Sequence, residues 1–73
     1  MAGSLEKRSF SLARHRTSVA LEPAFWAALE QIAAARSIAL VTLVTEVDAT
    51  RAQGSPLASA LRLTILGSMS LTI

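Results

Sequence analysis

The stretch from Arg16 to Glu22, followed directly by Pro23, constrains the fold more than any other part of this 73-residue chain. Its side chains alternate, with Val19 and Leu21 on one face of an extended backbone and polar or small residues on the other. This two-residue period is typical of a half-buried β-strand. A single short strand needs a hydrogen-bonding partner, and no second strand pattern follows downstream. We therefore expect the same strand of a second copy of the chain to pair with it, antiparallel, across a homodimer.

The size and composition of the chain also favour self-association. A chain of 73 residues forms one domain at most, and domains this small bury only about 60% of their unfolded surface. The sequence has no cysteine and offers no metal cluster, which removes two common ways of stabilising a small fold. Hydrophobic residues make up 52% of the chain, and its mean hydropathy is +0.49. We expect part of this apolar surface to be buried between subunits.

Two helices are expected after the strand. The first spans residues 23–36 and has proline at its first position, where the missing N–H costs nothing. A turn is expected within residues 33–39, because the apolar stripe loses phase there. The second helix spans residues 40–51 and has apolar residues at helical spacing, namely Leu40, Leu43, Val44 and Val47.

A third helix is expected near the C-terminus. Ser55 as N-cap and Pro56 as first residue open it, and Gly67 ends it. Its apolar stripe consists of Leu57, Leu61, Ile65 and Leu66. The chain is thereby divided into a disordered N-terminus at residues 1–6, a basic arm with the strand and two helices at 7–52, and a C-terminal helix with an apolar tail at 53–73.

Positive charge is concentrated near the N-terminus. The first sixteen residues contain one acid, Glu6, and a basic group made up of Lys7, Arg8, Arg14, His15 and Arg16. From residue 17 onward, three arginines are outnumbered by four acids. A basic arm favours an anionic partner, nucleic acid before a membrane, although basic tails also serve only for solubility. Residues 7–14 either extend the strand or lie as an ordered arm across a surface.

Several classes of protein are disfavoured. No window reaches the roughly 18 uncharged apolar residues that span a bilayer, and the basic start lacks the apolar run of a secretory signal. An arginine-rich, acid-poor start also resembles a transit peptide, but we expect a cytoplasmic protein. The sequence shows no catalytic constellation, glycine-rich phosphate loop or set of metal ligands, so we expect neither enzyme activity nor a cofactor.

A strand, a helix, a tight turn and a second helix, headed by a basic arm, form the mainly α ribbon-helix-helix arrangement. In a dimer of this kind, two antiparallel strands make a ribbon that fits the major groove of B-DNA. Side chains on the outward face of the ribbon reach base edges, while helix N-termini and arm cations bind the flanking phosphates.

Particular residues carry a family resemblance. The segment from His15 to Pro23 (HRTSVALEP), followed by Phe25 and Trp26, is a fairly specific signature. Together with the apolar helical positions, it resembles the short bacterial ribbon-helix-helix domain proteins over most of the chain, from Lys7 to about Leu66. Members of this family resemble the Arc and methionine repressors in fold and are inferred to bind DNA. The resemblance therefore implies a homodimeric regulator of transcription whose partner is double-stranded DNA.

The resemblance also implies three sets of functional residues. Base edges are read by Arg16, which can donate two hydrogen bonds to guanine, by Ser18, and by Ala20, which suits a thymine methyl group. The groups that bind phosphate are the side chains of Lys7, Arg8, Arg14 and His15 and the backbone N–H groups of Leu40 and Val41. The dimer core consists of Val19, Leu21, Phe25, Trp26, Leu29, Ile32, Leu43, Val44 and Val47.

Three features depart from the family pattern. The turn between the first two helices usually carries glycine, whereas this chain has Ser37, which would have to accept a less comfortable backbone if the position is left-handed. The second helix is usually capped by Ser or Thr, whereas this chain has Ala39. Losing that cap costs about 1 kcal/mol and weakens the phosphate site. The third helix lacks the basic residues with which the family's third helix tends to end.

Other prominent side chains have plainer interpretations. Trp26 is expected in the core rather than as an anchor for a partner, and His15 at phosphate or solvent rather than at a metal. Glu46 and Asp48 are expected on a solvated face or as intersubunit partners of an arginine. Arg62 is expected to pair with one of these two acids rather than to contact DNA.

Two hypotheses of function remain. In the first, the dimer is a sequence-reading regulator. Because the base-reading face has few polar groups, non-specific DNA binding and loss of the DNA function on an inherited fold stay open beside it. In the second, the dimer is a scaffold whose apolar segment at residues 63–73 binds a protein partner, as the tail of an antitoxin binds its toxin.

Overall fold

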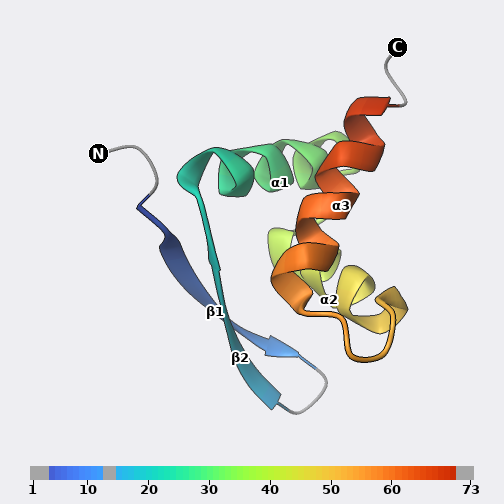
Figure 1. Ribbon diagram of the computed structural model, residues 1–73. Coiled ribbons are helices and arrows are strands. Elements are labelled where there is room, and N and C mark those ends of the chain that lie inside the picture. Colours follow the sequence, from blue (N-terminus) through green and yellow to red (C-terminus); the bar gives the residue numbers. More distant parts are fainter. Residues whose placement is uncertain (1–3, 13–14, 71–73) are drawn as a thin grey trace.

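The structure, a computed structural model, describes residues 4–12 and 15–70 and contains a β-hairpin followed by three helices (Figure 1). The hairpin and the helices lie on opposite sides of the molecule in this view. The elements in chain order are β1 (Glu6–Leu12), β2 (His15–Leu21), α1 (Pro23–Ala35), α2 (Leu40–Thr50) and α3 (Leu57–Ser70).

The strand expected from the sequence, β2, pairs within the same chain. It is antiparallel to β1, with a register that runs from Glu6 opposite Leu21 to Leu12 opposite His15. The expectation of one N-terminal strand is therefore wrong, because residues 6–12 form a second one. The signal for β1 was weak because its inward residues include Arg8 as well as the apolar Phe10 and Leu12. The hairpin starts at Glu6, which the sequence analysis had assigned to a disordered N-terminus.

The turn between α1 and α2 places Ser37 in a left-handed conformation, the case that the sequence left open. This residue has a φ of 58°. Its N–H donates to the carbonyl of Ala34, and the N–H of Ile38 donates to the carbonyl of Ala33, both at 3.0 Å. These two bonds define a Schellman motif, which satisfies the last carbonyls of α1. The motif ends α1 at Ala35 and turns the chain toward α2.

Helix α2 begins without a side-chain cap. Ala39 occupies the N-cap position in an extended conformation, and its carbonyl accepts the N–H groups of Thr42 and Leu43. The N–H groups of Leu40 and Val41 precede the first of these bonds, so they stay open to an outside acceptor. The absence of a cap expected from Ala39 is confirmed.

Helix α3 is longer than expected. It begins at Leu57 rather than Pro56 and continues through Gly67 to Ser70, so the expectation that Gly67 ends the helix is wrong. Glycine inside a helix costs only about 1 kcal/mol relative to alanine, and packing of Leu61 and Ile65 outweighs that cost. Leu66, included in the expected stripe, is 55% exposed.

One core joins the hairpin to all three helices. The buried residues are Leu12, Val19, Leu21, Trp26, Leu29, Ala33, Leu43, Val44, Val47, Ala60, Leu61 and Ile65. Helix α3 contacts α1, α2 and β2, so it packs as part of the same fold. Of the residues expected in a dimer core, seven are buried within this single chain, while Phe25 and Ile32 are half-buried.

The helices were also compared with the length and polarity of a membrane span. Among the described residues, no single helix is both long and apolar enough to cross a bilayer. Helices α1 and α2 reach that length and composition only together, and the chain bends by 100° between them.

Candidate nucleic-acid interface

The outward face of the hairpin collects polar and basic side chains. It carries Lys7, Ser9 and Ser11 from β1 and Arg16, Ser18 and Ala20 from β2. The register places Lys7 opposite Ala20, Ser9 opposite Ser18, and Ser11 opposite Arg16. All of these residues are exposed except Ala20, which is half-buried. The six positions, which we call the hairpin face, include two cations and no carboxylate.

The charged groups on the hairpin face are available to a ligand. Within the described part of the chain, neither Lys7 nor Arg16 has an ion-pair partner. The hydroxyls of Ser9 and Ser18 lie 3.1 Å apart and share a hydrogen bond across the strands. The face is therefore electropositive and rich in hydroxyl groups, a combination that suits phosphate oxygens and base edges.

Arg8 does not reach the hairpin face, although the sequence analysis grouped it with Lys7 as a phosphate ligand. Strand alternation turns its side chain inward, where its Nε lies 2.6 Å from Glu6 and its Nη1 2.7 Å from Glu30. The hydrogen bonds to Glu30 and then to Glu6 raise the pKa of the Arg8 guanidinium. Its Cζ atom also lies 4.9 Å from the ring centroid of Trp26, in a cation–π contact.

Trp26 is fully buried and fixes the hairpin to α1. Its indole N–H donates to the backbone carbonyl of Glu6 at 2.8 Å, and its ring lies 5.8 Å from that of Phe10. The expected core role of Trp26 is confirmed. Through Trp26 and Arg8, β1 is held against α1 as an ordered strand rather than as a loose arm.

The turn end of the hairpin borders a small hollow. Arg14, an expected phosphate ligand, lies outside the described residues, while His15 is exposed. The hollow has a volume of about 230 Å³ and is lined by Leu12, His15, Arg16, Thr17, Asp48, Arg51 and Leu57. Arg51 was missed in the sequence analysis. Its Nε donates to Asp48 at 2.8 Å and its Nη1 to the carbonyl of Ser55, so it is already partnered.

The remaining arginines form ion pairs within the chain. Arg36 pairs with Glu46 at 3.0 Å within the same chain, so Glu46 lies on an exposed face and its arginine partner is not from another subunit. Arg62 lies 3.1 Å from Glu22, so the expectation that it pairs with Glu46 or Asp48 is wrong. The Arg62 guanidinium also lies 5.6 Å from the ring centroid of Phe25. Arg62 is therefore a structural residue that ties α3 to the start of α1.

The pKa of Glu22 is lowered by two hydrogen bonds. The larger effect comes from its own backbone N–H and the smaller from the Arg62 side chain. Because both bonds favour the charged carboxylate, Glu22 stays ionised at neutral pH. Among the described residues, no group of His, Cys, Asp and Glu could hold a metal ion.

Comparison with known proteins agrees with this architecture. Residues 5–69 match the family described as the ribbon-helix-helix domain, so the chain belongs to that family. Searches of curated proteins and of solved structures found no match. Ribbon-helix-helix domains are typically non-enzymatic, DNA-binding regulatory domains that act as dimers, and membership therefore indicates a DNA-binding regulator.

Proposed function

We propose that this protein is a sequence-reading, DNA-binding homodimer of the bacterial cytoplasm that regulates transcription by inserting a two-stranded β-ribbon into the major groove. The hairpin face is the observation that carries the proposal. Its cations have no internal partners among the described residues, and it carries no carboxylate. A face of this kind attracts the DNA backbone and offers hydrogen-bond donors to base edges.

The free edge of β2 supplies the dimer contact in this proposal. The described sheet has only two strands, so each strand is paired on one side alone. An unpaired strand edge presents N–H and C=O groups that readily pair with another chain. Two β2 strands joined antiparallel by their free edges would form the central ribbon, with the hairpin faces of both chains on the same side of the sheet.

Each part of the proposed interface has a distinct chemical role. On the ribbon, Arg16 donates to guanine O6 and N7, Ser18 bonds a neighbouring base, and Ala20 meets a thymine methyl group. The open N–H groups of Leu40 and Val41, at the positive end of the α2 dipole, bind a flanking phosphate. The protein neutralises phosphate charge, so binding weakens steeply as salt rises.

The test compares binding to a fragment carrying the promoter of the protein's own gene with binding to a scrambled fragment of equal length. Fluorescence anisotropy across a salt series should show tighter promoter binding and a steep negative log–log slope. Arg16→Ala should remove the preference for the promoter fragment. Arg36→Ala is the matched control, because Arg36 is also exposed but lies at the α1–α2 turn and pairs with Glu46.

Other outcomes of this experiment are equally informative. Equal wild-type affinity for both fragments would mean that the protein does not read sequence and has an architectural role on DNA instead. Absence of binding to either fragment at low salt would overturn the DNA-binding proposal.

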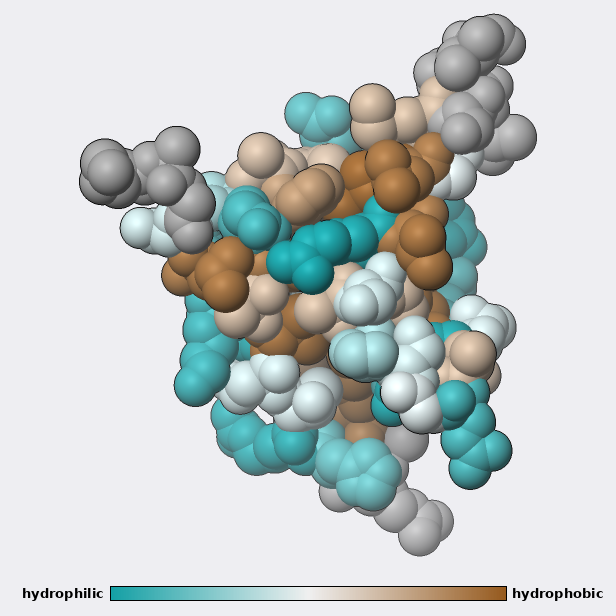
Figure 2. Space-filling view, viewed as in Figure 1, coloured by the Kyte–Doolittle hydropathy of each residue, from teal (hydrophilic) through white to brown (hydrophobic). Residues whose placement is uncertain are grey.

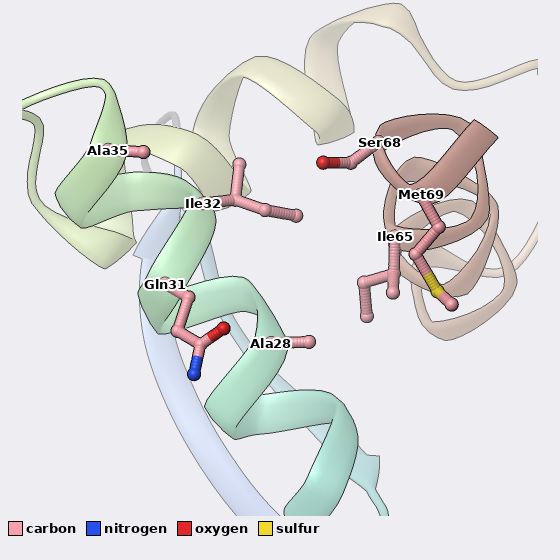
Figure 3. Close-up of a pocket in the computed structure, with 7 residues that line it drawn as sticks. All are labelled: Ala28, Gln31, Ile32, Ala35, Ile65, Ser68 and Met69. Atoms are coloured by element: carbon pink, nitrogen blue, oxygen red, sulfur yellow. The ribbon is translucent and has the colours of Figure 1, made fainter. Parts of the chain in front are cut away.

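A second candidate function, binding of a protein partner through α3, has its own structural support. A groove of about 390 Å³ lies between α1 and α3, lined mainly by apolar residues (Figure 3), namely Ala28, Gln31, Ile32, Ala35, Ile65, Ser68 and Met69. Leu63 and Leu66 on α3 are also more than half exposed. Figure 2 shows hydrophobic surface gathered toward the C-terminal end of α3.

Point substitutions test this second candidate better than truncation after Gly54 does. Truncation would remove Leu61 and Ile65 from the core and unfold the chain. The double variant Leu63→Gln and Leu66→Gln changes only exposed positions. An interaction module should lose its partner in a pull-down with this variant while keeping its thermal stability, whereas a DNA regulator should keep its promoter affinity.

A further inference from the structure

The proposed base reading involves side chains of β2 only. The outward side chains of β1 lie on the same hairpin face. Lys7, Ser9 and Ser11 alternate along β1 and are all exposed. Each lies directly opposite a residue of β2 on that face. A lysine and two hydroxyls in a row offer hydrogen-bond donors and positive charge, which suits phosphate oxygens.

The dimensions of the sheet decide where β1 would lie on DNA. In the proposed dimer, which this inference takes as its basis, the strand order is β1, β2, then β2 and β1 of the second copy. Neighbouring strands are about 4.8 Å apart, so the axes of the two outer strands are about 14 Å apart. The major groove is only about 12 Å wide. The two β2 strands fit into the groove, whereas the two β1 strands meet its edges, where the phosphates are.

We propose that β1 is a phosphate-binding strand, and that Lys7, Ser9 and Ser11 contact the DNA backbone on both edges of the major groove while β2 alone reads bases. The ordering of β1 supports this division. The Trp26 indole bonded to the Glu6 carbonyl and the Arg8 guanidinium bonded to Glu30 hold the strand against α1. Because the backbone of β1 is already fixed in this way, binding has to order only the side chains of its donors.

The Ser9–Ser18 hydrogen bond connects the two roles. A hydroxyl has one proton to donate, and either serine can be the donor in this pair. When Ser9 donates, the proton of Ser18 is free for a base acceptor. When the Ser9 hydroxyl donates its hydrogen bond to a phosphate oxygen, the Ser18 hydroxyl can instead donate to Ser9 and accept a hydrogen bond from a base. Contact with the backbone at β1 thus sets which hydrogen-bonding role Ser18 presents to the bases.

The experiment measures salt dependence and base preference in the full-length protein. Lys7→Ala should reduce the log–log salt slope by about two units per dimer and weaken promoter and scrambled fragments by the same factor. Ser11→Ala should also weaken both equally, leaving the profile of base preference across all single substitutions of the promoter site unchanged. Arg36→Ala is the charge-matched control: it should reduce the salt slope less than Lys7→Ala does, because Arg36 is paired with Glu46, and it should leave the base preference unchanged.

Uncharged analogues of single phosphates show which positions of the DNA backbone Lys7 contacts. Methylphosphonates placed singly along the site should weaken wild-type binding at phosphates on the groove edges. The penalty at the phosphates bound by Lys7 should disappear in Lys7→Ala, because the charge that they attracted is gone. A penalty of the same size in the variant at every position would overturn the assignment of Lys7.

The outcomes separate this inference from the proposed function. If the wild type does not bind DNA, or if Arg16→Ala keeps the full base preference, the proposed function fails and the inference fails with it. If wild-type binding depends on Arg16 but Lys7→Ala leaves the salt slope unchanged, only the inference fails. A change of base preference in Ser11→Ala would overturn the inference but not the proposed function. Ser11 would then read bases, and the hairpin of a single chain would be the ribbon in the groove.

Discussion

Lys7 and Arg8 are neighbours in sequence, yet their side chains lie on opposite faces of β1. Lys7 is exposed on the hairpin face, whereas Arg8 joins Glu6, Glu30 and the Trp26 ring. Charge alone therefore does not identify a DNA ligand in this segment. Strand alternation separates Lys7, the exposed cation that our proposal assigns to DNA, from Arg8, which supports the fold.

Arg8→Ala should destabilise the protein by about 1 kcal/mol, because it removes two partly exposed ion pairs and a cation–π contact. The free energy of unfolding, measured by urea titration, checks this. Lys7→Ala is the matched control and should change it by less than about 0.5 kcal/mol. If the two variants had equal effects, the structural role of Arg8 would be wrong.

Ser37→Gly should stabilise the protein by about 0.5 to 1 kcal/mol. Ser37 has a φ of 58°, where a side chain is strained and glycine is not. The gain is reduced by the greater freedom of glycine in the unfolded chain. Ala34→Gly, at an exposed helical position three residues earlier, should instead destabilise by about 1 kcal/mol. Thermal unfolding of the two variants should therefore shift in opposite directions.

Acidification should weaken the fold through Glu22. The pKa of Glu22 is lower in the folded protein than in the unfolded chain, so its contribution is present above the unfolded pKa and is lost as the pH falls through the folded pKa. Urea midpoints measured from neutral pH down through the carboxylate range should show this loss. Glu22→Gln should flatten that part of the curve, and an unchanged curve would contradict the assignment.

At the scale of single elements, α3 links the apolar C-terminal region to the core. Leu61 is fully buried, whereas Leu63, two residues later, is 65% exposed. Leu61→Ala should therefore cost about 2 to 5 kcal/mol, enough to unfold much of so small a domain. Leu63→Ala should be nearly neutral. Circular dichroism during thermal unfolding distinguishes the two, and similar effects would mean that α3 packs with a different face.

The hairpin and the α1–α2 turn show how elements are held at their ends. Pro23 begins α1 with one residue, Glu22, between it and the end of β2, and the Schellman motif at Ser37 ends the helix. Both signals are local, so they act before any tertiary contact forms. The position of β1 does not depend on such a local signal, because its inward residues become buried only when α1 and α2 are in place.

At the scale of the whole molecule, the single chain already has a core that reaches from Leu12 to Ile65. The proposed dimer therefore adds pairing of β2 edges to a core that each chain largely makes for itself. If two chains pair, the melting temperature should rise with protein concentration, because pairing stabilises the folded state by mass action. Differential scanning fluorimetry over a hundredfold concentration range, with sedimentation to report mass, checks this. A constant melting temperature with a monomer mass would contradict the dimer.

The amino-acid sequence by itself determined the order and near-limits of β2, α1 and α2, and the place of the turn between the two helices. These features depend on neighbouring residues, namely a period that changes at Pro23 and a stripe of apolar positions that loses phase after the first helix. Most core positions could be predicted for the same reason, since periodicity shows which side of an element is apolar.

Only the tertiary structure decided the partner of β2, the inward position of Arg8, the pairing of Arg62 with Glu22 and the continuation of α3 through Gly67. Each of these depends on groups that are distant in the sequence, and Arg62 and Glu22 are 40 positions apart. A local pattern states which side chains prefer burial or a charged partner. Which partner they meet depends on how the hairpin and the three helices close around the common core.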